Sequence, residues 1–267
     1  MCQTITVGIP FHSTTNVLQF CEAVNSILNQ TLIPDEIHLI QDGFIPDDLL
    51  ETVNFYVRSI SYVKHILLPQ NLGLSHAINI SVLSTTSKYY ARMDSDDISF
   101  PERLEKQVLF LEDNPNIEIL GAWAQEFKNN DNIGQGFIRK VPQVQSKMAE
   151  LLHYRNPLIH PTVVFRRSVF AKIGLYDSNF RLEEDLELWS RAFKMNVGIT
   201  NLSEVLLHYR FDGSGVNRRA SAIKYQIYVR CNYRTYSLKL NLLKLMAIIM
   251  RTLPCSFQEW IYQKRRE

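Results

Sequence analysis

The chain has 267 residues, of which 46% are hydrophobic and 21% charged, with 10 glycines and 10 prolines. This composition excludes disordered, collagen-like and disulfide-scaffold proteins, and the length favours one large domain with or without a small extension. The 29 basic and 27 acidic side chains nearly cancel, so no overall field attracts nucleic acid and we expect no nucleic-acid partner. The basic residues are nevertheless concentrated after residue 210.

The four cysteines form no CxxC pair and have no histidine at ligand spacing, so the sequence predicts neither a zinc site nor a redox motif. A reducing compartment is therefore favoured. The first residues lack a basic leader, and no stretch of about 20 residues is apolar enough to span a membrane. We expect a cytoplasmic protein, and no pattern specifies its oligomeric state.

Short β-branched runs alternate with segments of helical period through the first half of the chain, which is typical of parallel strands joined by crossover helices. The expected strands cover residues 4–9, 36–41, 62–68, 89–93 and 117–122. The expected helices cover residues 17–29, 47–59, 74–83 and 101–113. Further strands at 161–166 and 205–211 enclose a helix at 184–195, and a helical tail follows.

This pattern predicts an α/β fold in which a mostly parallel central sheet carries helices on both faces. We expect a main domain over residues 1–215 and a basic, amphipathic helical tail over residues 216–267. No internal repeat and no low-complexity linker interrupts the chain.

Polar side chains follow the expected strands, and ligands of open α/β sheets bind beyond the carboxyl ends of the strands. Pro10 and His12 end the first strand, Asp42 ends the second, and Asn71 and Gly73 follow the third. No glycine loop of the GxGxxG or GxxxxGK[ST] type is present, so other groups would have to hold the phosphates of a nucleotide. The segment from Asn71 to Gly73 is also consistent with a simple turn.

Three carboxylates, Asp94, Asp96 and Asp97, follow the fourth expected strand in the motif ARMDSDD. Carboxylates this close repel one another and are costly to desolvate unless a cation neutralises them. Mg²⁺ or Mn²⁺ commonly takes one or two protein carboxylates and completes its coordination with water and substrate phosphates. The motif predicts a divalent-metal site, and the alternative is a solvated turn in which one carboxylate caps the next helix.

A second acidic group, Glu183, Glu184 and Asp185, precedes and opens a later expected helix. Acidic residues stabilise a helix N-terminus through the helix dipole, and this structural role accounts for Glu183. Asp185 shares a helix face with Leu188 and Trp189, because residues three and four apart are neighbours. A carboxylate beside an apolar surface is suited to general-base catalysis, so both roles stay open for Asp185.

Taken in order, several segments resemble the inverting glycosyltransferases of family 2, which have the nucleotide-diphospho-sugar transferase type A fold. These segments are IPFHS, IQDG, NLGLSHAIN, ARMDSDD with ISFPERLEKQ, HPTVVFRR and EEDLELWSRA. The resemblance covers roughly residues 4–215 and is closest to bacterial enzymes that build repeat units of O-antigen, capsule or exopolysaccharide. Several of these add a sugar to an N-acetylhexosamine carried on polyprenyl diphosphate.

The resemblance implies a role for each matching residue. The nucleotide and donor would be bound by Pro10, His12, Asp42, Asn71, Gly73, Arg92, Asp94 and Arg210. Within that set, Asp42 would accept from the uracil edge. The metal on the donor diphosphate would be held by Asp96 and His208. Asp185 would be the catalytic base, and the acceptor side would be formed by His160, Glu184 and Trp189.

The resemblance thus implies a metal-dependent, inverting hexosyltransferase that uses Mn²⁺ or Mg²⁺. It would move a hexose from a UDP-sugar, with UDP-glucose or UDP-galactose favoured, to an N-acetylhexosamine on polyprenyl diphosphate. The β-linked product would belong to a bacterial surface polysaccharide. A loop over residues 211–217, with Gly213 and Gly215, is a candidate lid that excludes water.

Two alternatives remain from the sequence. A sugar nucleotidyltransferase would have a glycine-rich and basic loop after the first strand, and the segment IPFHS is not such a loop. An inactive membrane-associated scaffold of the same fold is the other alternative. The joint presence of Asp94, Asp96 and Asp185 argues against it.

The tail is apolar over most of a helical wheel between residues 238 and 253, with Lys244 and Arg251 on a polar stripe. Such a helix can lie in the headgroup region of an anionic membrane, where each nearby cation contributes about 1 kcal/mol. We therefore expect peripheral association with the inner face of the cell membrane, which suits a lipid-linked acceptor. The alternative is a helix packed on the main domain or in a dimer.

Overall fold

The computed structural model describes residues 4–128, 133–211 and 222–253, together with Phe257 and Lys264. Its first half alternates strands and helices: β1 (Ile5–Phe11), α1 (Val17–Leu28), β2 (Glu36–Asp42), α2 (Asp47–Ser59), β3 (Val63–Leu68), α3 (Leu74–Leu83) and β4 (Tyr89–Arg92). The second half contains β5 (Ile98–Ser99), α4 (Arg103–Asp113), β6 (Ile119–Phe127), β7 (Ile138–Arg139), α5 (Gln145–Leu152), the 3₁₀ turn η1 (His160–Thr162), β8 (Val164–Arg166), α6 (Val169–Ile173), α7 (Glu184–Lys194), β9 (Ile199–Arg210), α9 (Ile223–Asn232) and α10 (Leu238–Thr252).

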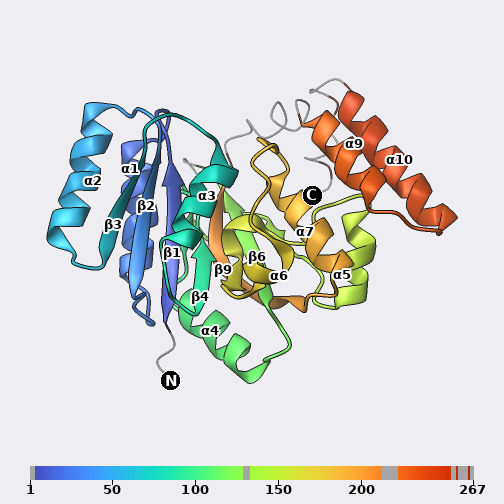
Figure 1. The fold of residues 1–267 in the computed structure, drawn as a ribbon, viewed down its shortest axis with the longest axis horizontal. Helices are drawn as coiled ribbons and strands as arrows, with labels where there is room; N and C mark the ends of the chain where they lie inside the picture. The colour runs from blue at the N-terminus through green and yellow to red at the C-terminus, as the bar shows by residue number, and fades with distance from the viewer. Residues whose placement is uncertain (1–3, 129–132, 212–221, 254–256, 258–263, 265–267) are drawn as a thin grey trace.

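The described strands form one nine-stranded sheet in the order β3-β2-β1-β4-β8-β6-β9-β5, with β7 paired to β6 (Figure 1). The strands β3, β2, β1 and β4 are parallel, as their crossover helices require. Beyond β4 the sheet is mixed, because β8 is antiparallel to both β4 and β6. The predicted α/β class with helices on both faces is confirmed, with the parallel pairing concentrated in the first half.

Two hydrophobic clusters cover the two faces of the sheet. On one face, Phe20 of α1, Leu49 of α2 and Val108 of α4 belong to the same buried cluster. On the other, Ile78 of α3 and Trp189 of α7 belong to a second cluster. Strand β1 is buried along its whole length, which explains why its sequence is apolar rather than alternating.

The second half differs from the expected pattern at several points. Residues 160–162 form a 3₁₀ turn and β8 begins only at Val164, because Pro161 has no N–H to donate to a ladder. Strand β9 begins at Ile199 rather than near residue 205, since a register shift opposite Trp123 interrupts its alternation. The short elements β5, β7, α5 and α6 carry too few residues for a periodic signal.

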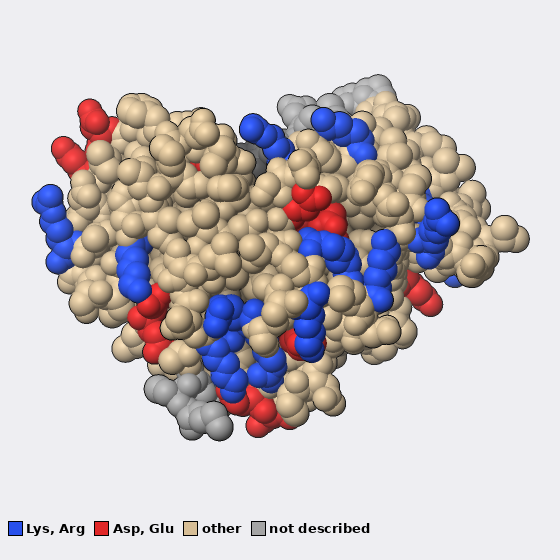
Figure 2. Space-filling view, viewed as in Figure 1, with Lys and Arg blue, Asp and Glu red and all other residues tan. Residues whose placement is uncertain are grey.

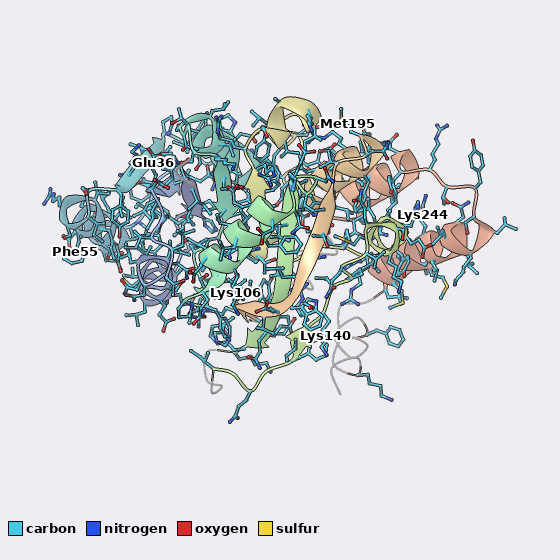
Figure 3. The ribbon with its side chains drawn as sticks, turned by 90° about the horizontal axis from the view of Figure 1, so that it is seen from below. Glu36, Phe55, Lys106, Lys140, Met195 and Lys244 are labelled. Atoms are coloured by element: carbon cyan, nitrogen blue, oxygen red, sulfur yellow. The ribbon has the colours of Figure 1, made fainter. Side chains whose placement is uncertain are left out.

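The C-terminal helices lie at the end of the molecule away from β3 and α2 (Figure 1). Figure 3 shows this separation, with Phe55 of α2 at one end and Lys244 of α10 at the other. The rings of Tyr225 and Tyr228 on α9 lie 5.3 and 5.6 Å from that of Phe180. None of the described helices combines the length and apolarity that crossing a membrane requires. The proposed boundary at residue 215 and the candidate lid from residue 212 onward lie outside the described residues, so both stay predictions.

Gly8 lies too close to Tyr90 for a larger residue, because a Cβ added at this position would meet the Tyr90 hydroxyl oxygen at 1.9 Å. That hydroxyl donates to Ser81 Oγ at 2.9 Å, so moving it disrupts a buried hydrogen bond. We expect Gly8→Ala to lower the free energy of unfolding by about 1–3 kcal/mol, measured by urea denaturation. The loss should be smaller in a Tyr90→Phe background, and an equal loss in both backgrounds would contradict this explanation.

Candidate active site

The carboxyl ends of several strands meet at one edge of the sheet. Strand β9 runs parallel to β4, because the pairs β4–β8 and β8–β6 are antiparallel and β6–β9 is parallel. Arg210 therefore ends β9 close to the acidic segment that follows β4. Its backbone N–H donates to Asp97 Oδ1 at 2.7 Å, and its Nε donates to the carbonyl of Asp96 at 2.6 Å. Residues 113 positions apart in the chain are thus joined at this edge.

Asp94, Asp96 and Asp97 form a cluster in which one oxygen of each lies within 4.8 Å of the others. Burial, followed by repulsion from Asp94, raises the pKa of Asp96 to about 6. The same causes raise the pKa of Asp97 well above its usual range, and its buried Oδ2 has no hydrogen-bond partner within the described chain. Crowded carboxylates with an unpartnered oxygen fit a hard divalent cation, and the partly exposed Asp94 and Asp96 are the accessible ligands.

His208, predicted as a metal ligand, is not a member of this cluster. Its ring lies 4.3 Å from the ring of Phe100 and 6.2 Å from that of Phe127. Burial lowers the pKa of His208, which keeps the imidazole neutral, and its buried Nδ1 has no partner among the described residues. The third carboxylate of the cluster is Asp97, so the ligand role of His208 stays a prediction.

Arg92 lies on the face of the sheet covered by α3 and α7. Side chains of a strand alternate between faces, and Ala91 and Met93 belong to the opposite cluster, so Arg92 shares the face of Tyr90. Arg92 is only 3% exposed, and its Nη2 forms an ion pair with Asp94. Its Nε and Nη1 are buried without a hydrogen-bond partner in the described part of the chain. The guanidinium is therefore buried with two of its donors unsatisfied by the described residues.

The charge of Arg92 acts on both acidic groups. Burial alone disfavours the charged guanidinium, but attraction from Asp94 and, further away, Asp97 raises the pKa of Arg92. In return, Arg92 lowers the pKa values of Glu184 and Asp185 against the effect of their burial. The acidic segment after β4 and the acidic start of α7 therefore both interact with one buried cation.

Asp185 is held in the first turn of α7. Its Oδ2 accepts from Asn156 Nδ2 at 2.5 Å and its Oδ1 accepts from the Leu186 amide at 2.7 Å. Burial, followed by repulsion from Glu183, raises the pKa of Asp185 to about 6. Burial and repulsion from Asp185 raise the pKa of Glu184 to about 8. Near neutral pH, Asp185 is mostly ionised and able to accept a proton, whereas Glu184 is mostly protonated.

The side chains predicted to contact the acceptor are more buried than the sequence suggested. Trp189 is fully buried, stacked on Phe165 with centroids 5.9 Å apart. His160 is buried beside it, and its Nε2 shares a hydrogen bond of 2.8 Å with the hydroxyl of Tyr176. Burial and the nearby Arg92 lower the pKa of His160 well below its usual range. Both residues support α7 from within the core, and a contact with an acceptor stays a prediction for them.

The expected nucleotide side contains one connected group. Both carboxylate oxygens of Asp42 accept backbone N–H groups, from Leu72 at 2.7 Å and from Gly73 at 2.9 Å. Asn71 Nδ2 donates to the carbonyl of Asp42 at 3.3 Å, and Gly73 has a φ of 91°, which favours glycine. A carboxylate has about four acceptor sites, so these two bonds do not saturate Asp42, and its contact with a uracil edge stays a prediction.

The remaining two predicted nucleotide residues lie at the end of β1, whose Phe11 pairs with Gln41 in the strand that Asp42 ends. Pro10 is buried within β1 opposite Ile40 of β2. The exposed His12 is turned toward its own loop, where its Nδ1 lies 3.2 Å from Thr14 Oγ1. Their contacts with a nucleotide stay predictions.

Asn156 is a site residue that sequence reasoning missed. It bonds Asp185 from 29 positions away, and the following Pro157 marks only a turn. Its sequence context gives no sign of its partner, because the contact depends on how the loop after α5 packs beside α7.

The raised pKa of Glu184 should make the stability of the protein depend on pH. Its pKa is about 8 in the folded protein against an ordinary 4.5, so the folded state retains a proton that the unfolded state releases. Stability should therefore fall as the pH rises from 4.5 to 8. Glu184→Gln mimics the protonated form, and we expect it to raise the free energy of unfolding at pH 8 by on the order of 1–3 kcal/mol, but not at pH 4.5.

Urea denaturation of the metal-free protein at both pH values measures this effect. Glu187→Gln is the matched control, because it removes an ion pair with Arg191 at 2.7 Å and should destabilise the protein slightly at pH 8. A Glu184→Gln effect of the same size at both pH values would refute the assignment.

Comparison with known proteins identifies the family. The family model described as Glycosyl transferase family 2 matches residues 6–174. The chain is 31% identical over 252 residues to the UDP-Gal:alpha-D-GlcNAc-diphosphoundecaprenol beta-1,3-galactosyltransferase of Escherichia coli, covering 91% of this chain and 89% of that protein. It is 30% identical over 256 residues to the amylovoran biosynthesis glycosyltransferase AmsE of Erwinia amylovora, covering 92% and 93% of the two chains.

Solved structures share the fold. S. aureus TarS 1-349 in complex with UDP has a TM-score of 0.63 at 16% identity, covering 97% of this chain and 78% of that one. The mannosyltransferase PcManGT from Pyrobaculum calidifontis, in complex with GDP-Man and Mn²⁺, has a TM-score of 0.65 at 14% identity, covering 95% and 71%. With the fold, the acidic site and the family match in agreement, the chain belongs to glycosyl transferase family 2 and is a glycosyltransferase.

Proposed function

We propose that this enzyme is an inverting hexosyltransferase of bacterial surface polysaccharide biosynthesis. It moves galactose or glucose from the UDP-sugar to an N-acetylhexosamine on polyprenyl diphosphate and forms a β-linkage. The observation that carries the proposal is the similarity over 91% of the chain to an Escherichia coli enzyme whose name gives UDP-Gal as donor and a GlcNAc-diphosphoundecaprenol as acceptor.

Asp185 is the proposed catalytic base. Its ionised carboxylate accepts the proton of the acceptor hydroxyl while that oxygen attacks the anomeric carbon from the face opposite the diphosphate. The single in-line displacement inverts an α-linked donor to a β-linked product, and UDP departs. Asn156 and the Leu186 amide orient the carboxylate, since each donates to one of its oxygens.

Asp94 and Asp96 are the proposed ligands of Mn²⁺ or Mg²⁺. When bound, such a cation neutralises the charge that develops on the departing diphosphate. Arg92 adds a permanent positive charge beside these carboxylates, and its unpartnered Nε and Nη1 are donors for a phosphate oxygen. Arg210 holds the acidic loop in place through its bonds to Asp96 and Asp97.

Two substitutions distinguish the role of the catalytic base from the role of the metal site. Asp185→Asn should lower kcat by roughly 10²- to 10⁴-fold while UDP still binds in the presence of Mn²⁺. Asp96→Asn should weaken the Mn²⁺-dependent binding of UDP itself, because a ligand of the cation is lost. Transfer from UDP-galactose and UDP-glucose to a synthetic GlcNAc-diphosphate lipid measures the first effect, and calorimetric titration with UDP measures the second.

Asp47→Asn is the control for both, because Asp47 lies exposed in the first turn of α2. Full transfer activity in Asp185→Asn would exclude the assigned base. Failure of the unaltered protein to bind UDP with Mn²⁺ would favour an inactive scaffold, and release of diphosphate from UTP and a sugar phosphate would favour a nucleotidyltransferase.

We also propose that α10 attaches the enzyme peripherally to the inner face of the cell membrane. None of its residues is buried, and Leu238, Leu242, Leu245, Met246 and Ile249 are each at least half exposed. Their spacing places them along one face of the helix. Charged side chains are sparse over α9 and α10 in Figure 2, and the exposed Lys239 supplies positive charge for anionic headgroups. Lys244 is turned toward α9, where its Nζ donates to the carbonyl of Tyr233 at 2.9 Å.

Substitution of this apolar face tests the attachment. Leu242→Glu with Ile249→Glu should reduce sedimentation with phosphatidylglycerol vesicles by at least about tenfold, because both changes place a charge at the lipid boundary. UDP binding should persist, since both side chains lie far from the acidic cluster. Asn241→Glu, which adds a charge beside the apolar face, should have a smaller effect, and equal sedimentation of all variants would exclude α10 as the anchor.

A further inference from the structure

Glu183 has an unusual backbone conformation at the entrance to the proposed base. Its φ is 60° and its ψ is 25°, in the left-handed region that residues other than glycine rarely occupy. It is the N-cap residue of α7, yet its side chain makes no capping hydrogen bond. An ordinary N-cap residue is extended and accepts from the helix amides. Another contact must therefore hold Glu183 in this conformation.

Gln226 of α9 provides that contact. Its Nε2 donates to Glu183 Oε1 at 2.6 Å across 43 positions of sequence. Gln226 is 1% exposed, so water has little access to the donor side of the bond. One helical turn further on, the buried Arg230 donates to the carbonyl of His153, and its charge attracts Glu183. Two polar side chains on the buried face of α9 thus act on the segment that precedes α7.

The rest of this segment is fixed from both sides. The ring of Phe180 packs against α9, and its carbonyl accepts from Ser75 Oγ of α3 at 2.9 Å. Within α7, Trp189 is anchored in the core. Because Glu183 directly precedes the first turn of α7, a change in its conformation would shift that turn, where Asp185 meets Asn156.

We propose that Gln226 is a positioning residue for the transfer reaction: it holds Glu183 in the left-handed conformation that presents Asp185 to the acceptor. This inference rests on the proposed role of Asp185 and assigns the C-terminal helices a part in catalytic geometry. The helix α9 lies outside the segment matched by the family model, which ends at residue 174.

The test compares Gln226→Ala in two backgrounds. Loss of the tether should lower kcat by roughly 10- to 100-fold, as expected for a displaced catalytic group, and change the KM for UDP-galactose by less than about twofold. Glycine adopts positive φ without a tether, so Glu183→Gly should lower kcat less than Gln226→Ala does. In the Glu183→Gly background, Gln226→Ala should have little further effect, because the carboxylate that Gln226 contacts has been removed.

Asn232→Ala is the matched control, since it removes an exposed amide side chain from the same helix. Additive effects of Gln226→Ala and Glu183→Gly, or an equal loss of kcat with Asn232→Ala, would show a general structural role and overturn the proposal. So would an unchanged kcat in Gln226→Ala.

Hydrogen exchange separates this proposal from the proposed function. Gln226→Ala, but not Asn232→Ala, should speed exchange of the amides at the start of α7 in the full chain. If the unaltered protein transfers no sugar, the proposed function fails, yet faster exchange in Gln226→Ala still supports the tether. Unchanged exchange overturns it, whatever the activity.

Discussion

The buried charge of Arg92 is the constraint on which this site depends. A guanidinium removed from water is stable only beside anions, and a group of buried carboxylates is stable only beside a cation. Asp94 pairs with Arg92, and strand alternation places Arg92 on the face covered by α7, where its charge also lowers the pKa values of Glu184 and Asp185. The stacking of Trp189 on Phe165 sets the position of α7 against the sheet. Hydrophobic packing on this face therefore determines how two acidic groups, distant in sequence, share one cation.

The charges of these carboxylates are not fully balanced by the protein alone. The pKa values of Asp96, Asp97, Glu184 and Asp185 are all raised, so at neutral pH the folded state either retains protons or carries repulsion that the unfolded state lacks. A ligand that brings cations to Asp96 and Asp97 offsets that cost when it binds. Because Glu184 retains its proton near neutral pH, Asp185 is the mostly ionised one of these two neighbouring carboxyl groups. Two neighbouring buried carboxylates thus differ in protonation, because Asp185 accepts hydrogen bonds from Asn156 and the Leu186 amide that stabilise its charge, and general-base chemistry needs such a difference.

The first half of the fold was predictable because each of its strands is a short apolar run and each of its helices has an apolar face of helical period. The same holds for the acidic motif after β4, since charged residues at the end of a buried strand stand out in the sequence. The second half was less predictable, because its short strands depend on pairing partners. The contacts of Asp97 with Arg210, Asp185 with Asn156 and Glu183 with Gln226 follow from how loops and helices pack, which local patterns do not encode. The polar residues of α9 gave a misleading signal, because Gln226 and Arg230 are buried against other polar groups instead of facing water.

The C-terminal helices link the proposed catalytic base to the proposed membrane attachment. The helix α9 contacts the segment before Asp185 on one side and packs against α10 on the other. If α10 lies at a membrane surface, then the helix that orients the base packs directly against the helix that contacts the lipid. An acceptor whose diphosphate stays at the headgroups would then reach the site from the side on which α9 holds α7. In this arrangement a membrane anchor needs no separate linker to bring substrate and base together, because one pair of helices meets both requirements.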